Sequence, residues 1–416
     1  MEKIILKKFG PISDLELEIK QLTVLTGPQT SGKSTVAKSV YFFKSIPNIF
    51  LNFLLNYKKI FSPNQTDFIE FVSEHFQNLW SKNYYSENTV FKYFFDNEID
   101  ASITFENLKP TFEVHKKIND KIQLFFKNHD FSNHLFQLET NLENYSKIDL
   151  IKIVQDIFGI VPNYDAVYIP AGRSSLLKID KFQKEYMTKN QKNENFIDYF
   201  SDYYLNEFAN RINPEISFLT GKNIDFEKKA DDLIEKLMNG KLKIEENKLT
   251  LTLNTNIVVN LNELSSGQEE IIWLATILKQ FIVNNIEKFV VVEEPETNLY
   301  PESQKDIVML IALFLNSNSK NQLILNTHSA YVLSVINNLL LAKRKHTETE
   351  NKTVVENIIS NNFWLDLENT TAILFNPKEN KIEDCINREH GYIRLKSVDN
   401  VADEINDLFY NLSEIE

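Results

Sequence analysis

Residues 27–34 read Gly-Pro-Gln-Thr-Ser-Gly-Lys-Ser and fit the pattern G-x-x-x-x-G-K-[ST] of a phosphate-binding loop. Gly27 and Gly32 allow the backbone to curl so that its N–H groups face phosphates. Lys33 would bring its positive charge to the β- and γ-phosphates, and the Ser34 hydroxyl would bind Mg²⁺. A chance match is rare in a chain with only nine glycines. The predicted nucleotide-binding residues here are Gly27, Pro28, Gln29, Thr30, Ser31, Gly32, Lys33, Ser34 and Thr35.

Paired carboxylates form the second half of the predicted site. An apolar run beginning at Phe289 ends in Glu293 and Glu294. Beside a phosphate-binding loop, Glu293 would help to hold Mg²⁺, and Glu294 would orient or deprotonate the attacking water. His328 follows the apolar run 322–325 and is placed to donate to a γ-phosphate, although a lone histidine is more often structural.

Two further positions are candidates for nucleotide binding. The sequence Leu-Ser-Ser-Gly-Gln at 264–268 precedes a largely apolar helix, and there it predicts an anion cradle or an ordinary helix N-cap. Arg173 is one of five arginines among 45 basic residues. In a chain that otherwise uses lysine, an arginine indicates a planar, bidentate contact with a phosphate or a fixed carboxylate, and the alternative is a surface ion pair. The residues concerned are Ser265, Ser266, Gly267, Gln268 and Arg173.

The elements that position these groups follow from hydrophobic periodicity. An apolar, β-branched run at 22–26 leads into the loop, and a helix can begin at Ser34. Two short paired strands, 4–6 and 15–19, precede it. From Glu263 onward helices and strands alternate, which predicts a parallel sheet with covering helices. The alternating segments are 268–283, 289–292, 302–316, 322–325 and 330–340.

The pattern also indicates how the chain is divided. Residues 46–160 are rich in Phe, Tyr and Asn and mostly helical in rhythm, with one hairpin predicted at 102–105 and 111–114. We expect a discontinuous nucleotide-binding core, a helical insertion and a second helical lobe before Leu264. Their boundaries are 1–45 with 161–175 and 241–416 for the core, 46–160 for the insertion, and 176–240 for the lobe. Smaller predicted elements are a strand at 166–169, a β-hairpin or meander at 241–260, a strand at 371–375 and a helix at 401–412.

Composition excludes several classes of protein. The net charge of −13 argues against a broadly basic surface for nucleic acid. One cysteine, Cys385, excludes an internal disulfide framework and fits a reducing cytoplasm. The first residues lack the long apolar core of a signal peptide, and the longest apolar run, 307–315, is too short to span a bilayer.

The order of these motifs resembles the ATP-binding-cassette (ABC) ATPases, most closely the SMC/RecF-like branch and the overcoming-lysogenization-defect (OLD) type. The opening Ile-Leu-Lys-Lys-Phe-Gly-Pro-Ile, Tyr-Ile-Pro-Ala-Gly-Arg at 168–173 and Glu-Pro-Glu-Thr-Asn-Leu-Tyr-Pro at 294–301 are similar to stand-alone bacterial ATPases, many of them in anti-phage defence loci such as Septu and PARIS. The resemblance covers about 1–45 and 240–416. It implies an α/β fold: an ABC-type P-loop ATPase head, with a mixed or parallel sheet and an antiparallel N-terminal subsheet, plus the largely helical insertion.

The resemblance also implies a composite site that uses ATP and Mg²⁺. Ser265 and Gly267 of one subunit would complete the γ-phosphate shell of another, so that two ATP molecules lie between two heads. Glu294 would be the catalytic base and His328 the residue that senses the γ-phosphate. The chain departs from the pattern in three places: Glu293 replaces an aspartate, Tyr300 stands where an aspartate is expected, and residues 170–173 occupy the place of the glutamine loop.

Three biological roles are compatible with such a head. The first is the ATPase or sensor of a defence system that acts with a separate effector nuclease or toxin. The second is a RecF-like factor that clamps DNA, and the third, which the long insertion fits poorly, is a transporter subunit. Residues 329–416 show no second acidic constellation, so we expect no nuclease in this chain.

Overall fold

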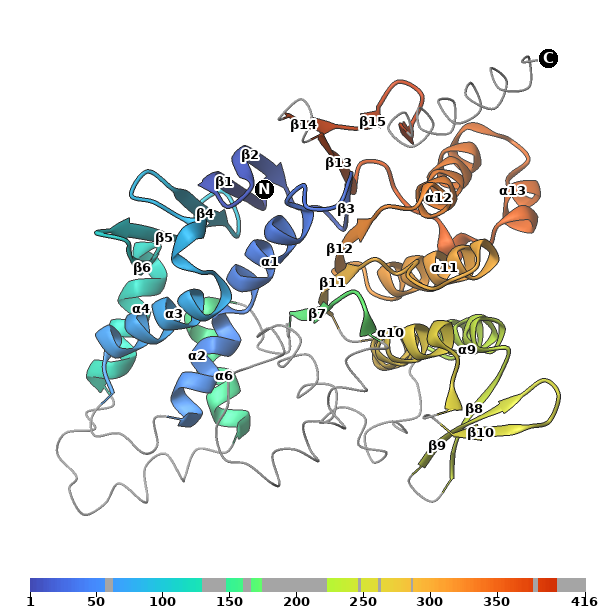
Figure 1. Ribbon diagram of the computed structural model, residues 1–416, viewed down its shortest axis with the longest axis horizontal. Coiled ribbons are helices and arrows are strands. Elements are labelled where there is room, and N and C mark those ends of the chain that lie inside the picture. Colours follow the sequence, from blue (N-terminus) through green and yellow to red (C-terminus); the bar gives the residue numbers. More distant parts are fainter. Residues whose placement is uncertain are drawn as a thin grey trace, which may run out of the picture.

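The computed structural model describes residues 1–56, 63–128, 147–159, 166–173, 223–245, 248–260, 263–285, 287–376 and 381–394, and all structural statements concern these residues. Figure 1 shows a central sheet with helices on both sides, and a second lobe on the same side as the helix at 33–44. Residues 176–222 of the predicted lobe and the predicted helix at 401–412 lie outside the described residues.

The central sheet has the strand order β14-β13-β3-β12-β11-β7. All neighbouring pairs are parallel except β14, which runs antiparallel to β13. The expected parallel sheet is therefore confirmed, with one antiparallel edge. Its strands are β3 (Leu22–Thr26), β7 (Val167–Ile169), β11 (Phe289–Glu293), β12 (Gln322–Thr327), β13 (Thr370–Asn376) and β14 (Lys381–Asp384).

Side chains of alternate residues in these strands pack into two separate hydrophobic cores, one on each face of the sheet. Val291 and Ile324 pack on the side of helix α1 (Lys33–Lys44). Val290 and Leu325 point to the opposite side. Because both faces are covered, the strands are apolar along their whole length, as a parallel sheet requires. The helices on the opposite side are α9 (Ile224–Met238), α10 (Ser266–Asn284), α11 (Pro301–Ser317) and α12 (Ala330–Glu348).

A second, antiparallel sheet has the order β2-β1-β4-β5-β6. The predicted hairpin is confirmed as β5 paired with β6. Strand β4 pairs with β1, which places part of the 46–160 segment in the same sheet as the N-terminal strands. The strands are β1 (Lys3–Phe9), β2 (Ile12–Glu18), β4 (Val90–Phe94), β5 (Asp100–Glu106) and β6 (Lys109–Val114).

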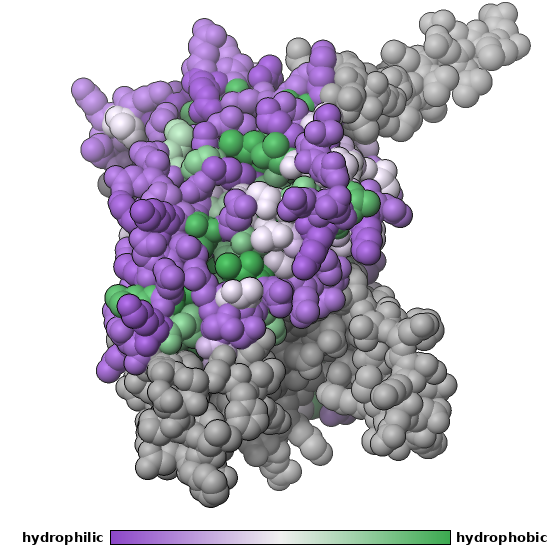
Figure 2. Space-filling view, turned by 90° about the vertical axis from the view of Figure 1, so that its left-hand side faces the viewer, coloured by the Kyte–Doolittle hydropathy of each residue, from purple (hydrophilic) through white to green (hydrophobic). Residues whose placement is uncertain are grey.

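The aromatic residues of the insertion pack against helix α1 as well as against one another. Phe43 of α1 stacks on Phe91 and Tyr93, with ring centroids 4.9 and 5.4 Å apart. One cluster of buried residues spans both segments, so the insertion and the nucleotide-binding half share a core. The outer face of the lobe is mainly hydrophilic, with small separate hydrophobic patches (Figure 2). The helices of the insertion are α2 (Ile46–Asn56), α3 (Gln65–Leu79), the short η2 (Lys82–Tyr84), α4 (Lys116–Asn128) and α6 (Lys147–Phe158).

The remaining elements lie around the second core. The predicted meander is confirmed as a three-stranded antiparallel sheet. Among the described residues, no helix combines the length and apolar character needed to cross a bilayer. The elements are β8 (Gly240–Glu245), β9 (Lys248–Leu253), β10 (Val258–Asn260), α13 (Lys352–Ile358), η6 (Asn361–Phe363), β15 (Ile386–Asn387) and β16 (Tyr392–Ile393).

Candidate functional site

The loop between β3 and α1 has the geometry of an anion cradle. Gly27 and Gly32 have φ values of 133° and 102°, which side chains rarely adopt. There is also no room for a side chain at Gly27, since a Cβ there would lie 2.4 Å from the Phe375 carbonyl oxygen. No side chain caps the first turn of α1, so its N–H groups are open to an anion.

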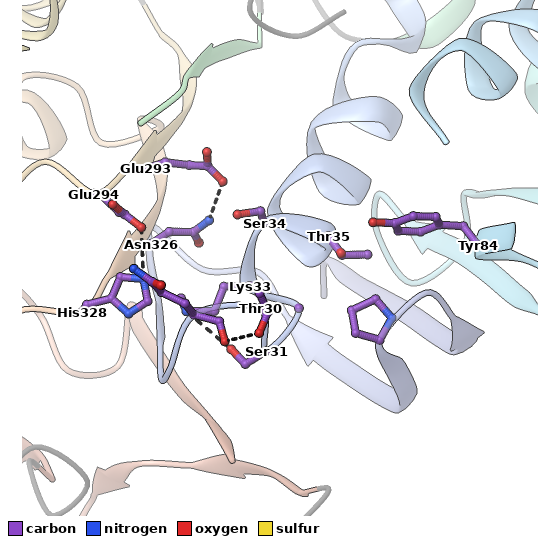
Figure 3. Close-up of a pocket in the computed structure, with 13 residues that line it drawn as sticks. Thr30, Ser31, Lys33, Ser34, Thr35, Tyr84, Glu293, Glu294, Asn326 and His328 are labelled. Atoms are coloured by element: carbon purple, nitrogen blue, oxygen red, sulfur yellow. Dashed lines mark hydrogen bonds and ion pairs between the residues drawn. The ribbon is translucent and has the colours of Figure 1, made fainter. Parts of the chain in front are cut away.

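A pocket of about 500 Å³ opens over this loop (Figure 3). One wall is the loop and the start of α1. The opposite wall comes from the carboxyl ends of β11 and β12, where parallel strands bring their terminal polar residues together. The lining residues are Pro11, Gln29, Thr30, Ser31, Gly32, Lys33, Ser34, Thr35, Tyr84, Glu293, Glu294, Asn326 and His328.

Lys33 is held by the backbone of its own loop. Its Nζ donates to the carbonyl oxygens of Gly27 at 2.9 Å and Pro28 at 2.6 Å. Burial lowers the pKa of Lys33 to about 8, and the nearby carboxylates of Glu294 and Glu293 partly oppose this shift. Phosphate oxygens would replace these neutral carbonyl partners with stronger, charged acceptors.

Glu294 and His328 form a pair on the opposite wall. The Nε2 of His328 lies 3.0 Å from Glu294 Oε1. The hydrogen bond from His328 lowers the pKa of Glu294, while partial burial works against it. An ionised carboxylate only accepts, so Nε2 carries the hydrogen in this pair. Glu294 also has a φ of 43°, an uncommon conformation for a residue with a side chain.

Side-chain oxygen atoms that could bind a metal ion lie close to Ser34 (Figure 3). Asn326 Nδ2 donates to Glu293 Oε1 at 3.1 Å. Asn326 Oδ1 is buried and has no hydrogen-bond partner among the described residues. Mg²⁺ prefers oxygen and keeps several waters in nucleotide sites, with only one or two protein ligands. A carboxylate, a hydroxyl and an unsatisfied amide oxygen are therefore a set that would fit a hydrated Mg²⁺, for which Ser34 and Glu293 are the candidate protein ligands.

A third carboxylate fixes the loop that carries His328. Glu296 Oε1 accepts hydrogen bonds from the Thr327 hydroxyl at 2.7 Å, from the His328 N–H at 2.7 Å and from the Ser329 N–H at 3.2 Å. These contacts hold the end of β12 against the turn that follows β11. They keep the His328 ring beside Glu294.

Four residues at this site were missed by sequence reasoning: Asn326, Glu296, Tyr84 and Pro11. The sequence could have indicated Asn326 and Glu296. Each is a polar residue near the carboxyl end of an apolar strand, and these two strands, β12 and β11, lie side by side. Tyr84 has no such signal. It comes from η2 in the insertion, lies beside Pro11 in the pocket lining and is 36% exposed.

The segment Ser265–Gln268 lies outside the pocket lining. Ser265 is the N-cap of α10, and its side chain and Gln268 form a capping box, which is the ordinary alternative considered above. Ser265 and Ser266 are exposed. A Cβ on Gly267 would lie 2.9 Å from the Asn298 carbonyl oxygen, so this glycine lets α10 approach the loop after Glu294.

Arg173 also lies outside the pocket lining, which differs from its predicted contact with the nucleotide. Its side chain is 1% exposed and pairs with Glu270, with Nε 3.0 Å from Oε2. The structure thus supplies the fixed carboxylate that the sequence offered as one alternative, and it excludes a surface ion pair.

Comparison with known proteins identifies a family and a set of similar solved structures, three of which are described here. The AAA ATPase domain family matches residues 1–333, a region that contains the whole pocket. The SmcHead bound to the C-winged helix domain of ScpA is 14% identical with a TM-score of 0.42, over 80% of this chain and 90% of that one. The SMC head domain from Thermotoga maritima is 15% identical with a TM-score of 0.37, over 80% and 90%.

The third structure is the Smc head domain with an extended coiled coil bound to the C-terminal domain of ScpA, derived from Pyrococcus furiosus. It is 11% identical with a TM-score of 0.44, over 98% of this chain and 100% of that one. The comparison with curated proteins finds no significant match.

Proposed function

Because this chain belongs to the AAA ATPase domain family and is an ATPase, we propose that it hydrolyses ATP in the pocket between the loop after β3 and the ends of β11 and β12. One observation carries the assignment. The ionised Glu294, held by His328, faces the phosphate-binding loop across a single pocket.

Each wall of the pocket has its own task in this proposal. The loop N–H groups and Lys33 bind the β- and γ-phosphates, as a helix N-terminus and a cation favour. Ser34 and Glu293 would hold Mg²⁺, which would neutralise charge on the phosphates. Asn326 fixes the Glu293 carboxylate through the hydrogen bond from Nδ2. Tyr84 closes the pocket from the insertion side.

In this proposal, Glu294 and His328 on the opposite wall support the hydrolysis step. Water attacks the γ-phosphorus, the bond to the β-phosphate oxygen breaks, and Glu294 accepts the proton of the water. His328 keeps the Glu294 carboxylate ionised and pointed into the pocket. When ATP is bound, the same imidazole lies next to the γ-phosphate side of the loop.

Two substitutions separate binding from hydrolysis. Lys33→Ala should abolish ATP binding, since Lys33 is the only lysine or arginine in the lining of the described pocket. Glu294→Gln should bind ATP with unchanged affinity and lose phosphate release by at least about a hundredfold. Filter binding and a phosphate-release assay measure the two effects. Unchanged turnover in Glu294→Gln would contradict the assignment.

A homodimer or a higher homo-oligomer would complete the site. Ser265, Ser266, Gly267 and Gln268 lie outside the pocket of their own chain, and the two serines are exposed. We propose that they contact the γ-phosphate bound by a second copy, so that two ATP molecules lie between two heads. Support comes from the resemblance to ABC-type ATPases, together with this exposure.

For the biological role, we propose the ATPase or sensor of a bacterial anti-phage defence system with a separate effector, a nuclease or toxin, acting in the cytoplasm without a membrane. The alternative is a RecF- or SMC-like clamp on nucleic acid. A net charge of −13 favours the first reading, because phosphate contacts require a basic surface. Turnover measured with and without duplex DNA tests it. Strong, salt-sensitive stimulation by DNA would favour the clamp.

A further inference from the structure

Arg173 is the largest of the fully buried side chains in the described part of the protein. Burial of a guanidinium is unfavourable unless its donors are paired. The phosphate pocket does not explain the position, because Arg173 is absent from its lining. The hydrogen-bond partners of Arg173 explain its position instead.

On one side, Arg173 is attached to α10. Its Nε lies 3.0 Å from Glu270 Oε2 and donates to the Glu270 carbonyl oxygen at 3.1 Å. The backbone N–H of Arg173 donates to the same Oε2 at 3.0 Å. Glu270 is completely buried in the first turns of α10, two turns or less from Ser265.

On the other side, Arg173 is attached to the end of β11. Nη1 donates to the Glu293 carbonyl oxygen at 2.8 Å and Nη2 donates to the Glu294 carbonyl oxygen at 3.2 Å. Nη1 also donates to the Pro170 carbonyl oxygen at 2.9 Å. The guanidinium therefore bridges α10 and two residues with proposed roles, Glu293, which would hold Mg²⁺, and Glu294, which would accept the proton of water.

This bridge acts where the backbone conformation is unusual. Glu294 has a φ of 43° and its carbonyl oxygen accepts from both Arg173 and the Thr297 N–H. A left-handed residue with a side chain persists only where its surroundings hold it. The direction of its peptide plane sets the direction in which its carboxylate enters the pocket.

We propose that Arg173 is a positioning residue, which holds Glu294 in its left-handed conformation and couples that conformation to the position of α10. This rests on the proposed role of Glu294 in hydrolysis. Arginine suits the task because its planar fork donates in several fixed directions at once, whereas lysine offers one point charge. The contact of Gly267 with Asn298 adds a second link between α10 and the same loop.

Arg173→Lys in the full-length chain tests the proposal, with Arg388→Lys as a matched control. Arg388 is an exposed arginine that pairs with Asp384, at 2.9 Å. We expect Arg173→Lys to lower kcat by about tenfold or more, since a small misplacement of a catalytic group has that effect. The Kd for ATP should stay within about twofold, because Arg173 is outside the pocket lining and its hydrogen bonds run to residues 170, 270, 293 and 294. Arg388→Lys should change neither.

A double variant separates positioning from a general structural role. In the Glu294→Gln background, adding Arg173→Lys should change the residual turnover by less than about twofold, because the residue through which it acts is already disabled. A residue that supports the site in another way would lower turnover further and would weaken ATP binding.

Glu270→Gln covers the case in which Arg173→Lys does not fold. It keeps the shape and one oxygen acceptor but removes the charge from the contact, so kcat should fall about fivefold with the Kd for ATP unchanged. Values of kcat within about twofold of the parent in the folded variants would overturn the proposal. If Glu294→Gln alone retained full turnover, the proposed role of Glu294 in hydrolysis would itself fail, and the two failures are therefore distinguishable.

Discussion

Lys33 brings a positive charge to a site where burial makes that charge unfavourable. Its pKa is lowered from an ordinary 10.5 to about 8 in the free protein, and bound phosphates would raise it again. Well below pH 8 both the free and the bound forms carry the proton, so the titration of Lys33 does not change the affinity for ATP there. Above pH 8 the free form loses the proton and binding must restore it.

We therefore predict that ATP binding takes up close to one proton at pH 9 and almost none from this group at pH 7.2. The affinity should fall by up to about tenfold per pH unit above pH 8. Calorimetry in buffers of different ionisation enthalpy measures the uptake. Lys38→Arg, one turn along α1, is the control and should leave the uptake intact. Equal uptake at both pH values would contradict the lowered pKa.

The His328–Glu294 pair gives a second prediction, which concerns the acid side of the pH profile rather than the alkaline side. The hydrogen bond from His328 lowers the pKa of Glu294, so the base stays ionised further into the acid range. His328→Ala removes that bond and leaves burial, which raises the pKa. The acid limb of kcat/KM should move to higher pH, and turnover at neutral pH should fall by about ten- to a hundredfold.

A pH–rate profile from pH 5 to 8 checks this shift. His390→Ala is a suitable control, since His390 is an exposed residue outside the pocket lining. An acid limb that stays in place in His328→Ala would mean that another group sets it.

At the scale of elements, strand β4 and helix α1 tie the insertion to the nucleotide-binding half. β4 pairs with β1, and Phe43 packs on Phe91 and Tyr93 across the junction. Removing residues 46–160 would expose the buried face of α1, so this deletion is expected to give an unfolded or aggregated chain rather than a working head.

The point variant Phe43→Ala should lower the free energy of unfolding by about 3–5 kcal/mol, because it leaves a cavity in a fully buried cluster. Denaturant unfolding measures the loss. Phe94→Ala on the neighbouring strand, at a half-buried position, should cost less. Equal and small losses would indicate that the two halves do not share a core in solution.

At the scale of the whole molecule, the proposed sandwich predicts association that depends on ATP. Glu294→Gln retains bound ATP and should form dimers that light scattering detects only when ATP is present. Adding Ser265→Arg should prevent this association while ATP binding continues, because the exposed Ser265 would face the phosphate of the other copy. A strict monomer with full ATPase activity would contradict the composite site.

Local sequence determined the parts of this protein that depend on local chemistry. The glycines and Lys33 specify the loop by their own conformational and charge properties, and the apolar runs specify β3, β11 and β12. The hairpin β5–β6 and the meander β8–β10 were predicted for the same reason, since neighbouring segments pair there. The alternation of helices and strands from Glu263 onward also predicted the correct class of sheet.

Tertiary structure alone decided which distant residues meet. Asn326 reaches Glu293 because β12 lies beside β11, and Tyr84 enters the pocket because β4 pairs with β1. Arg173 and Glu270 are 97 positions apart, yet they form a buried pair. Periodicity reports which face of an element is buried but not which element covers it. That choice depends on strand order and packing over the whole chain, and so the aromatic insertion and the nucleotide-binding half share one core.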